Sequence, residues 1–226
     1  MLENLKTNTQ IPFPEKESYL ILNGDSGNIE LLACPKNQKL LEASKTNAIA
    51  IICHPHPLHG GTMNNKVVFT LHKAFFDSGY ATVRFNFRGV GRTEGVHDNG
   101  IGEANDLQTV INWVKSTNPN CEIVLAGFSF GAFISFKTSK TIDCKGLVTV
   151  APVIHHQDYN KYLPLSCPWL AVGAELDDII PAQQLADWIT ENTSEVNFIE
   201  ISGCDHFFHG KLPELKSAVI AWLANS

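Results

Sequence analysis

Short apolar runs rich in β-branched residues alternate with amphipathic stretches along most of the chain, and this alternation restricts its fold more than any other feature. Runs at 19–22 and 29–33 flank a glycine-containing turn at 24–27 and predict an opening antiparallel hairpin. Six further strands are predicted at 48–53, 81–87, 122–126, 147–151, 169–172 and 196–201. Helices are predicted at 65–78, 103–116, 131–140, 181–191 and 212–225. The pattern is typical of an α/β fold with a mostly parallel eight-stranded sheet and helices on both faces.

The length of the chain predicts a single domain, 1–226. With 226 residues, of which 44% are hydrophobic, it can form one substantial core but not two comfortable α/β domains. A formal net charge of −6, without a run of Lys or Arg, argues against nucleic acid and against an anionic membrane surface as partners. We expect a monomer or a homodimer.

Targeting signals and disulfides are not expected either. The first residues, 1–7, lack a basic start followed by an apolar stretch, and no segment is long enough for a membrane span. A cytoplasmic location is therefore expected. The six cysteines are scattered without C-x-x-C spacing, which favours buried free thiols over disulfides or a metal site.

A serine occupies the centre of the sequence GFSFG at 127–131, between a predicted strand and a predicted helix. A G-x-S-x-G sequence indicates a nucleophile turn only in this strand–turn–helix context. The two glycines remove Cβ atoms that would clash where the chain reverses sharply, so Ser129 can be held with its hydroxyl clear of the backbone.

An acid and a histidine follow, each just after a later predicted strand. The strand at 169–172 leads to Asp177, and the strand at 196–201 leads to His206. The carboxyl ends of parallel strands meet at one edge of a sheet, so both side chains can converge on Ser129 there. The chain order Ser, Asp, His is the order found on one particular hydrolase scaffold.

Four motifs together resemble those of the α/β-hydrolase superfamily, over nearly the whole chain. They are HPHPLHGG at 54–61, NFRGVGRTEG at 86–95, the GFSFG turn, and DHFFHG at 205–210. The combination is similar to a small, cap-less bacterial group of serine esterases. The resemblance implies a Ser129–His206–Asp177 triad, with Asp177 four residues before Pro181. Ala174 stands where related sequences usually have glycine, so Asp178 stays open as the acid. Among the nine histidines, His209 stays open as the base.

Two backbone N–H donors are needed to stabilise a tetrahedral oxyanion. Phe130 directly follows Ser129 at the positive end of the predicted helix and is expected to supply one. The second is expected from the loop after the third strand, where Pro55 and Pro57 have no N–H. His56 and Leu58 remain, and the resemblance favours His56.

Several side chains are candidates for the walls of a substrate pocket. Only about fifteen residues, 152–166, separate the strand after the serine from the strand that leads to the acid, so no large lid domain is expected. Histidine and tyrosine residues of that segment are candidate walls: His155, His156, Tyr159 and Tyr162. Phe128, Phe130, Leu58 and Phe207 are further apolar candidates.

Two other polar clusters have alternative interpretations. Arg88 and Arg92 could hold a substrate carboxylate, but pairing of one of them with Asp106 or Glu103 to anchor the loop is favoured. The histidines at 54, 56 and 59 could be metal ligands, but the proposed oxyanion loop already explains them, so no metal is predicted.

The sequence thus predicts a serine hydrolase of carboxylic esters or thioesters that works through an acyl-enzyme without a cofactor. Its partner would be a small-molecule ester or thioester substrate. A peptidase or amidase with the same triad is the alternative within enzymes, because the fold does not fix the leaving group. A non-catalytic binding protein on the same scaffold is the alternative outside enzymes.

Overall fold

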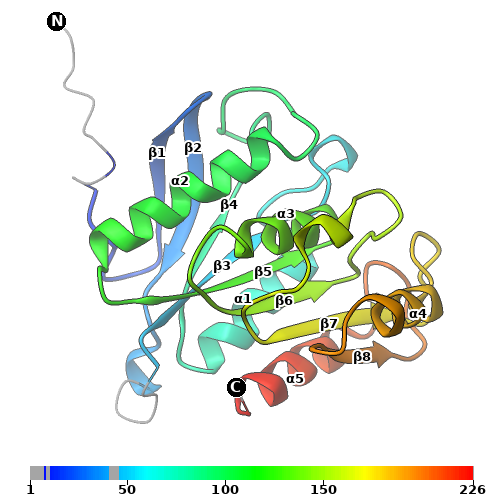
Figure 1. Ribbon diagram of the computed structural model, residues 1–226. Helices are drawn as coiled ribbons and strands as arrows, with labels where there is room; N and C mark the ends of the chain where they lie inside the picture. Colours follow the sequence, from blue (N-terminus) through cyan, green and yellow to red (C-terminus); the bar gives the residue numbers. More distant parts are fainter. Residues whose placement is uncertain (1–7, 9–10, 41–45, 226) are drawn as a thin grey trace, which may run out of the picture.

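The fold is built on one twisted sheet whose second strand runs antiparallel to both of its neighbours, whereas the other neighbouring strands are parallel (Figure 1). The computed structural model describes residues 8, 11–40 and 46–225. Within them the sheet has eight strands in the order β1-β2-β4-β3-β5-β6-β7-β8. Their bounds are β1 Ser18–Gly24, β2 Gly27–Cys34, β3 Ala48–Cys53, β4 Ala81–Phe85, β5 Glu122–Phe128, β6 Cys144–Val150, β7 Trp169–Ala174 and β8 Asn197–Ile201. The predicted mostly parallel, eight-stranded sheet is confirmed.

Helices cover both faces of this sheet, as predicted. The α-helices of the described residues are α1 Lys66–Asp77, α2 Gly102–Thr117, α3 Phe130–Ser139, α4 Ala182–Asn192 and α5 Leu212–Leu223. Two apolar clusters separate by face: residues of α2, α3 and α4 pack in one, and residues of α1 and α5 in the other. Figure 1 shows α2 and α3 in front of the sheet and α1 behind it. The central strands are buried on both sides, and for this reason their sequences are continuous apolar runs.

The predicted elements are all present, and their ends differ by a few residues. The fourth strand ends at Phe85 rather than at residue 87. The chain turns away there because the Phe87 N–H donates to a ring nitrogen of His54, 3.0 Å away, instead of to a neighbouring strand. Pro181 precedes helix α4 as its N-cap rather than lying in its first turn. Residues 1–7, whose composition argued against a leader, lie outside the described residues.

The connection from β6 to β7 determines how open the carboxyl edge of the sheet is. It contains one short 3-10 helix, Tyr159–Tyr162, and no inserted domain. The expected absence of a large lid is therefore confirmed for this connection, which lies wholly within the described residues. The ends of β3, β5, β7 and β8 all reach the same edge because these strands run parallel in register.

Candidate active site

Ser129 lies on the tight turn between β5 and α3, in a backbone conformation that few residues other than glycine adopt. Its φ is 55° and its ψ is −117°. Such a conformation costs on the order of 1–3 kcal/mol and persists only where the surroundings enforce it. The flanking glycines allow the close approach: a Cβ on Gly127 would lie 2.1 Å from the Gly131 oxygen, and one on Gly131 would lie 2.4 Å from the His54 oxygen. The Ser129 N–H donates to the Val150 oxygen at 2.8 Å.

Ser129, His206 and Asp177 form a continuous hydrogen-bonded chain. The Ser129 Oγ lies 3.0 Å from His206 Nε2, and His206 Nδ1 lies 2.7 Å from Asp177 Oδ2. His206 and Asp177 are each 3% exposed, and Ser129 is 8% exposed. The structure therefore brings together the three residues predicted as a triad, although 77 positions separate the serine from the histidine.

The Asp177 carboxylate is fixed at both oxygens. Oδ1 accepts hydrogen bonds from the backbone N–H groups of Ile179 and Ile180, at 2.8 and 2.9 Å. Oδ2 is thereby directed at His206 Nδ1, where a carboxylate can accept but not donate. The proton of the neutral imidazole consequently lies on Nδ1, and Nε2 has a free lone pair toward the serine hydroxyl.

The alternatives left open for acid and base lie elsewhere. Asp178 is exposed. His209 is exposed as well, and its Nδ1 lies 2.7 Å from Asp205 Oδ2 on the same surface turn. Neither side chain contacts Ser129, whereas Asp177 and His206 are buried and aligned with it.

Two backbone N–H groups beside Ser129 have no acceptor among the described residues, those of Phe130 and His56. Phe130 is the first residue of α3, where helix N–H groups lack partners and the helix dipole is positive. Leu58, the other candidate, is 70% exposed and its N–H already donates to His56 Nδ1 at 3.2 Å. The geometry thus favours Phe130 and His56 as oxyanion donors.

His54 holds the loop that presents His56. Its ring is fully buried, with Nδ1 donating to the Pro55 oxygen at 2.6 Å and Nε2 accepting from the Phe87 N–H at 3.0 Å. Both ring nitrogens are thus used inside the protein, and burial lowers the pKa of His54 to about 4. His54 therefore stabilises the loop through both ring nitrogens, which leaves neither of them to bind a metal.

These buried neutral histidines predict how stability changes with pH. Burial lowers the pKa of His54 and of His72 to about 4 each, whereas an exposed histidine titrates near about 6.5. At these two sites the unfolded chain therefore binds more protons than the folded protein between about pH 6.5 and 4. We expect the free energy of unfolding to be greatest above about pH 6.5 and to fall as the pH drops through this window, as measured by urea unfolding.

Matched variants test this assignment. His72→Gln removes one of the two titrating rings and should make the pH dependence between about 6.5 and 4 shallower. His209→Gln alters an exposed histidine and should keep the wild-type slope. Equal slopes in all three proteins would show that buried histidines do not govern acid stability.

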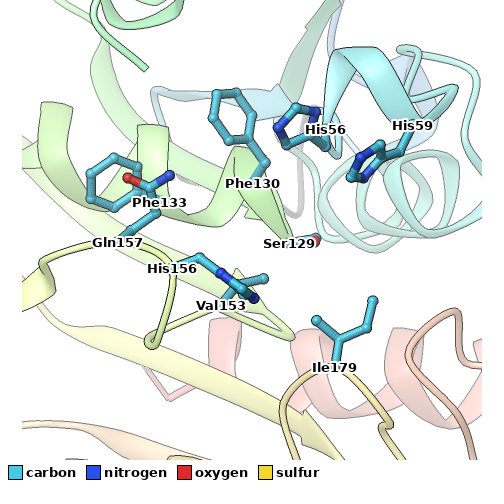
Figure 2. Close-up of a pocket in the computed structure, with 9 residues that line it drawn as sticks. All are labelled: His56, His59, Ser129, Phe130, Phe133, Val153, His156, Gln157 and Ile179. Atoms are coloured by element: carbon cyan, nitrogen blue, oxygen red, sulfur yellow. The ribbon is translucent and has the colours of Figure 1, made fainter. Parts of the chain in front are cut away.

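A cavity of about 280 Å³ opens beside Ser129. In Figure 2 the rings of Phe130, His56 and His59 lie along one side of it, and Val153, His156 and Ile179 along the opposite side. Phe133 and Gln157 complete the residues that line it. A second cavity of about 150 Å³ also reaches Ser129 and is lined in addition by His206, Phe207, Gly60, Gly61 and Asn65.

Only some of the residues predicted from the sequence as pocket walls line these two cavities. Phe207 lines the smaller cavity and His156 the larger one. The prediction was wrong for Phe128 and Tyr159. Phe128 is fully buried and packs against the His206 ring. Tyr159 packs in the core, where its ring contacts Phe133, Phe136 and Trp188. Leu58 lines neither cavity.

The side chains of His155 and Tyr162 also point elsewhere. His155 Nε2 lies 2.6 Å from the Gln184 side-chain oxygen, and Tyr162 packs edge-on against Phe133. The wall residues missed by sequence reasoning are Phe133, Val153, Gln157 and Ile179. Phe133 alone had a usable signal, since it follows Phe130 by three positions and lies on the same side of α3.

Arg88 anchors its loop, as favoured from the sequence. Its guanidinium Nη2 lies 2.8 Å from Asp106 Oδ1, and its backbone N–H donates to Asp106 Oδ2 at 2.9 Å. Both side chains are buried, at 8% and 2% exposure. The alternative of a substrate-carboxylate clamp at Arg88 is therefore wrong, because the guanidinium is already paired inside the protein.

The remaining sequence expectations concern metals, thiols and membranes. No group of three or more metal-binding side chains is found among the described residues. All six cysteines are buried and free, which confirms the prediction of unpaired thiols. Within 8, 11–40 and 46–225, none of the helices combines the length and apolar composition that crossing a bilayer requires.

One family model, two solved structures and one further relative are similar to this chain over most of its length. A family model described as serine aminopeptidase, S33, matches residues 47–211. The structure of an alpha-beta serine hydrolase homologue from Coxiella burnetii is 40% identical, with a TM-score of 0.87 over 92% of this chain and 98% of that chain. XC6422 from Xanthomonas campestris, an α/β serine hydrolase without a lid, is 31% identical with a TM-score of 0.90, over 96% of this chain and 97% of that one. The protein RP471 of Rickettsia prowazekii is 34% identical over 215 residues, which cover 90% of this chain and 87% of the relative.

Proposed function

Because this chain belongs to the α/β serine hydrolases, in the family described as serine aminopeptidase, S33, we propose that it hydrolyses carboxylic esters or thioesters through an acyl-enzyme on Ser129. The observation that carries the proposal is the continuous chain from the Ser129 hydroxyl through His206 to the buried Asp177 carboxylate. A serine hydroxyl is a weak nucleophile at neutral pH and needs such a base.

In the first half of the reaction, the Ser129 oxygen attacks the substrate carbonyl carbon while His206 Nε2 takes the hydroxyl proton. The carbonyl oxygen becomes an oxyanion that accepts hydrogen bonds from the Phe130 and His56 N–H groups. Asp177 stabilises the imidazolium through Nδ1. As the carbonyl re-forms, the bond to the leaving group breaks, and His206 gives its proton to the departing oxygen or sulfur.

The second half repeats these steps with water as the nucleophile. Water loses a proton to His206 Nε2 and attacks the acyl carbon, and the same two N–H groups hold the second oxyanion. Collapse breaks the bond to Ser129, which recovers the proton from His206. The carboxylic acid leaves, and the enzyme returns to its starting state without a metal or an organic cofactor.

A proline at position 56 tests the second oxyanion donor with little change in backbone shape. The φ of His56 is −51°, close to the value fixed by the proline ring, so His56→Pro removes the N–H at a residue whose own φ already suits proline. We expect kcat for a small ester to fall by about 10²- to 10³-fold. His56→Ala loses the same side chain but keeps the N–H, so its kcat should fall much less. Equal losses in both variants would contradict a role for this backbone donor.

The aminopeptidase named in the family description is the second candidate activity. The family match itself favours it, and the same triad can cleave amides. Recognition of a free α-ammonium group requires a carboxylate beside the scissile bond. The described residues that line the two cavities at Ser129 include neither Asp nor Glu. This composition supports ester or thioester hydrolysis over aminopeptidase activity.

A substrate panel separates these activities. Purified wild-type protein is given 4-nitrophenyl acetate, an acetyl thioester and an aminoacyl 4-nitroanilide, with Ser129→Ala as the control for each. Hydrolysis of the ester or thioester by the wild type alone is the expected result. Hydrolysis of the anilide at a higher kcat/KM than the ester would favour the peptidase, and no hydrolysis of any member would favour a non-catalytic binding protein.

A further inference from the structure

The two cavities at Ser129 differ in whether His206 lines them, and this difference indicates which end of a substrate each cavity holds. His206 lines the smaller cavity of about 150 Å³ and is not among the residues that line the larger one of about 280 Å³. If the proposed function holds, His206 must reach the leaving-group atom to protonate it. The leaving group therefore lies in the smaller cavity, toward His206 and Phe207. The other substituent of the carbonyl, the acyl part, must then lie in the larger cavity.

The larger cavity has walls suited to an uncharged, flat group. Its lining contains no Lys, Arg, Asp or Glu, so no permanently charged side chain in it pairs with a carboxylate, phosphate or ammonium group. Burial and the neighbouring His59 and His97 hold the pKa of His56 below its ordinary value, so this imidazole is neutral at neutral pH. Without a fixed opposite charge in this lining, burial of an ionic acyl group carries the cost of an unpaired charge, which favours an uncharged one.

Aromatic and imidazole rings make up much of the wall. Phe130 and Phe133 lie in α3 on one side, and the rings of His56 and His59 stack on each other at 4.4 Å beside Phe130. Aromatic rings attract one another in offset or edge-to-face arrangements beyond the effect of area burial alone. A rigid ring also loses less conformational entropy on binding than a flexible chain does. The cavity volume is near the lower end of the usual range for small-molecule sites, about 300 Å³, which limits the group to a small size.

We propose that the larger cavity is the acyl subsite, that it selects a small uncharged aromatic acyl group of about the size of phenylacetyl, and that the smaller cavity beside Phe207 takes the leaving group. The polar ends of His59, His156 and Gln157 lie at the same cavity and can hydrogen-bond a substituent on the ring.

Acyl selectivity is measured with one constant leaving group. The wild type is given the 4-nitrophenyl esters of acetate, phenylacetate, cyclohexylacetate and decanoate, and kcat/KM is compared. Phenylacetate is expected to exceed acetate by about tenfold or more, the effect of filling an apolar pocket. The kcat/KM for phenylacetate is also expected to exceed that for decanoate and that for cyclohexylacetate. The cyclohexyl group has similar bulk but no flat ring. A preference for decanoate, or equal rates for phenylacetate and cyclohexylacetate, would overturn the aromatic assignment.

Variants in each cavity test which end of the substrate each one holds. Val153→Phe and Gln157→Phe add bulk to the larger cavity only, and each should bring the phenylacetate-to-acetate ratio close to one. Gln157 is half-buried, so its variant is the one to use if Val153→Phe fails to fold. Phe207→Ala changes the smaller cavity only, and should alter the dependence on the alcohol part in a series of phenylacetate esters while keeping the acyl ratio.

The outcomes for the subsites and for the proposed function are separable. A protein whose hydrolysis of 4-nitrophenyl acetate depends on Ser129, but whose acyl ratio responds to Phe207→Ala and not to Val153→Phe or Gln157→Phe, is a serine esterase with the two ends assigned the wrong way round. A protein with no Ser129-dependent hydrolysis of any ester lacks the proposed function, and the subsite assignment fails with it.

Discussion

Replacing Ser129 by alanine is expected to lower kcat/KM for 4-nitrophenyl acetate by about 10⁴-fold or more. The variant keeps the His206–Asp177 pair and the two proposed oxyanion donors, but loses the oxygen proposed to form the acyl-enzyme. Only the slow attack of water, assisted by the oxyanion donors and binding, remains. Steady-state kinetics with a protein free of contaminating esterases measures the loss.

The control for this variant is a serine at the far end of α3, the helix that follows Ser129. Ser139 is buried and its hydroxyl donates to the Phe136 oxygen, away from His206. Ser139→Ala should keep the order of magnitude of the wild-type rate. Thermal unfolding of Ser129→Ala should remain cooperative, because no packing is lost at a residue that is small in both proteins. A residual rate within about tenfold of the wild type would exclude Ser129 as the nucleophile.

Asp177→Asn is expected to lower kcat near neutral pH by about 10³- to 10⁴-fold while the protein remains folded. The reason lies in the hydrogen bonds at Oδ1, which accepts from two backbone N–H groups. An asparagine must keep its carbonyl oxygen there, so its NH₂ group faces His206 Nδ1. The ring then carries its proton on Nε2, the wrong tautomer for taking the proton of Ser129.

Asp178→Asn provides the matched control one residue away. Asp178 is exposed and no hydrogen bond of its side chain to the active site is found among the described residues, so its variant should retain nearly the wild-type kcat. The comparison also settles the choice between the two acids that the sequence left open. A large loss in Asp178→Asn with little loss in Asp177→Asn would contradict the role assigned to the buried carboxylate.

The fold and the three aligned side chains could be predicted from the sequence because their signals are local. Each strand of the sheet is an apolar run, and Ser129, Asp177 and His206 each follow such a run within a few residues. Parallel strands then bring their ends together without any further information. The Arg88–Asp106 pair was also accessible, since an arginine in a turn and an acid in the next helix are near in sequence.

The walls of the cavities could not be predicted in the same way, because they depend on which face a side chain occupies. Phe128 follows Val124 and Ala126 at even spacing on β5 and therefore packs on the side of α1 and α5, away from the larger cavity. Phe128 is the exception among these residues, because strand alternation alone predicts which face of the sheet it occupies. Tyr159 lies in a connection without periodicity, and only tertiary packing decides that its ring enters the core.

The proposed second oxyanion donor, His56, was favoured by the resemblance, and a side-chain contact in the structure now supports the same choice over Leu58. Two of the four residues from Pro55 to Leu58 are prolines, which have no N–H group and cannot be donors. The choice between the remaining two rests on the His56 ring, whose Nδ1 accepts the Leu58 N–H and so removes it from the active site. The direction of a side chain in an irregular loop is set by its neighbours, here His59, His97 and Phe130.

The central claim is that His206 and Asp177 make Ser129 a nucleophile, and covalent labelling tests it most directly. The wild type, Ser129→Ala and Asp177→Asn are treated with a small alkyl fluorophosphonate, and the site and rate of labelling are followed by mass spectrometry of the intact protein and of its peptides. The account predicts one phosphonyl group on Ser129 in the wild type, none in Ser129→Ala, and labelling of Asp177→Asn slowed by about 10²-fold or more. A folded wild type that stays unlabelled, or that is labelled at another residue, would contradict it.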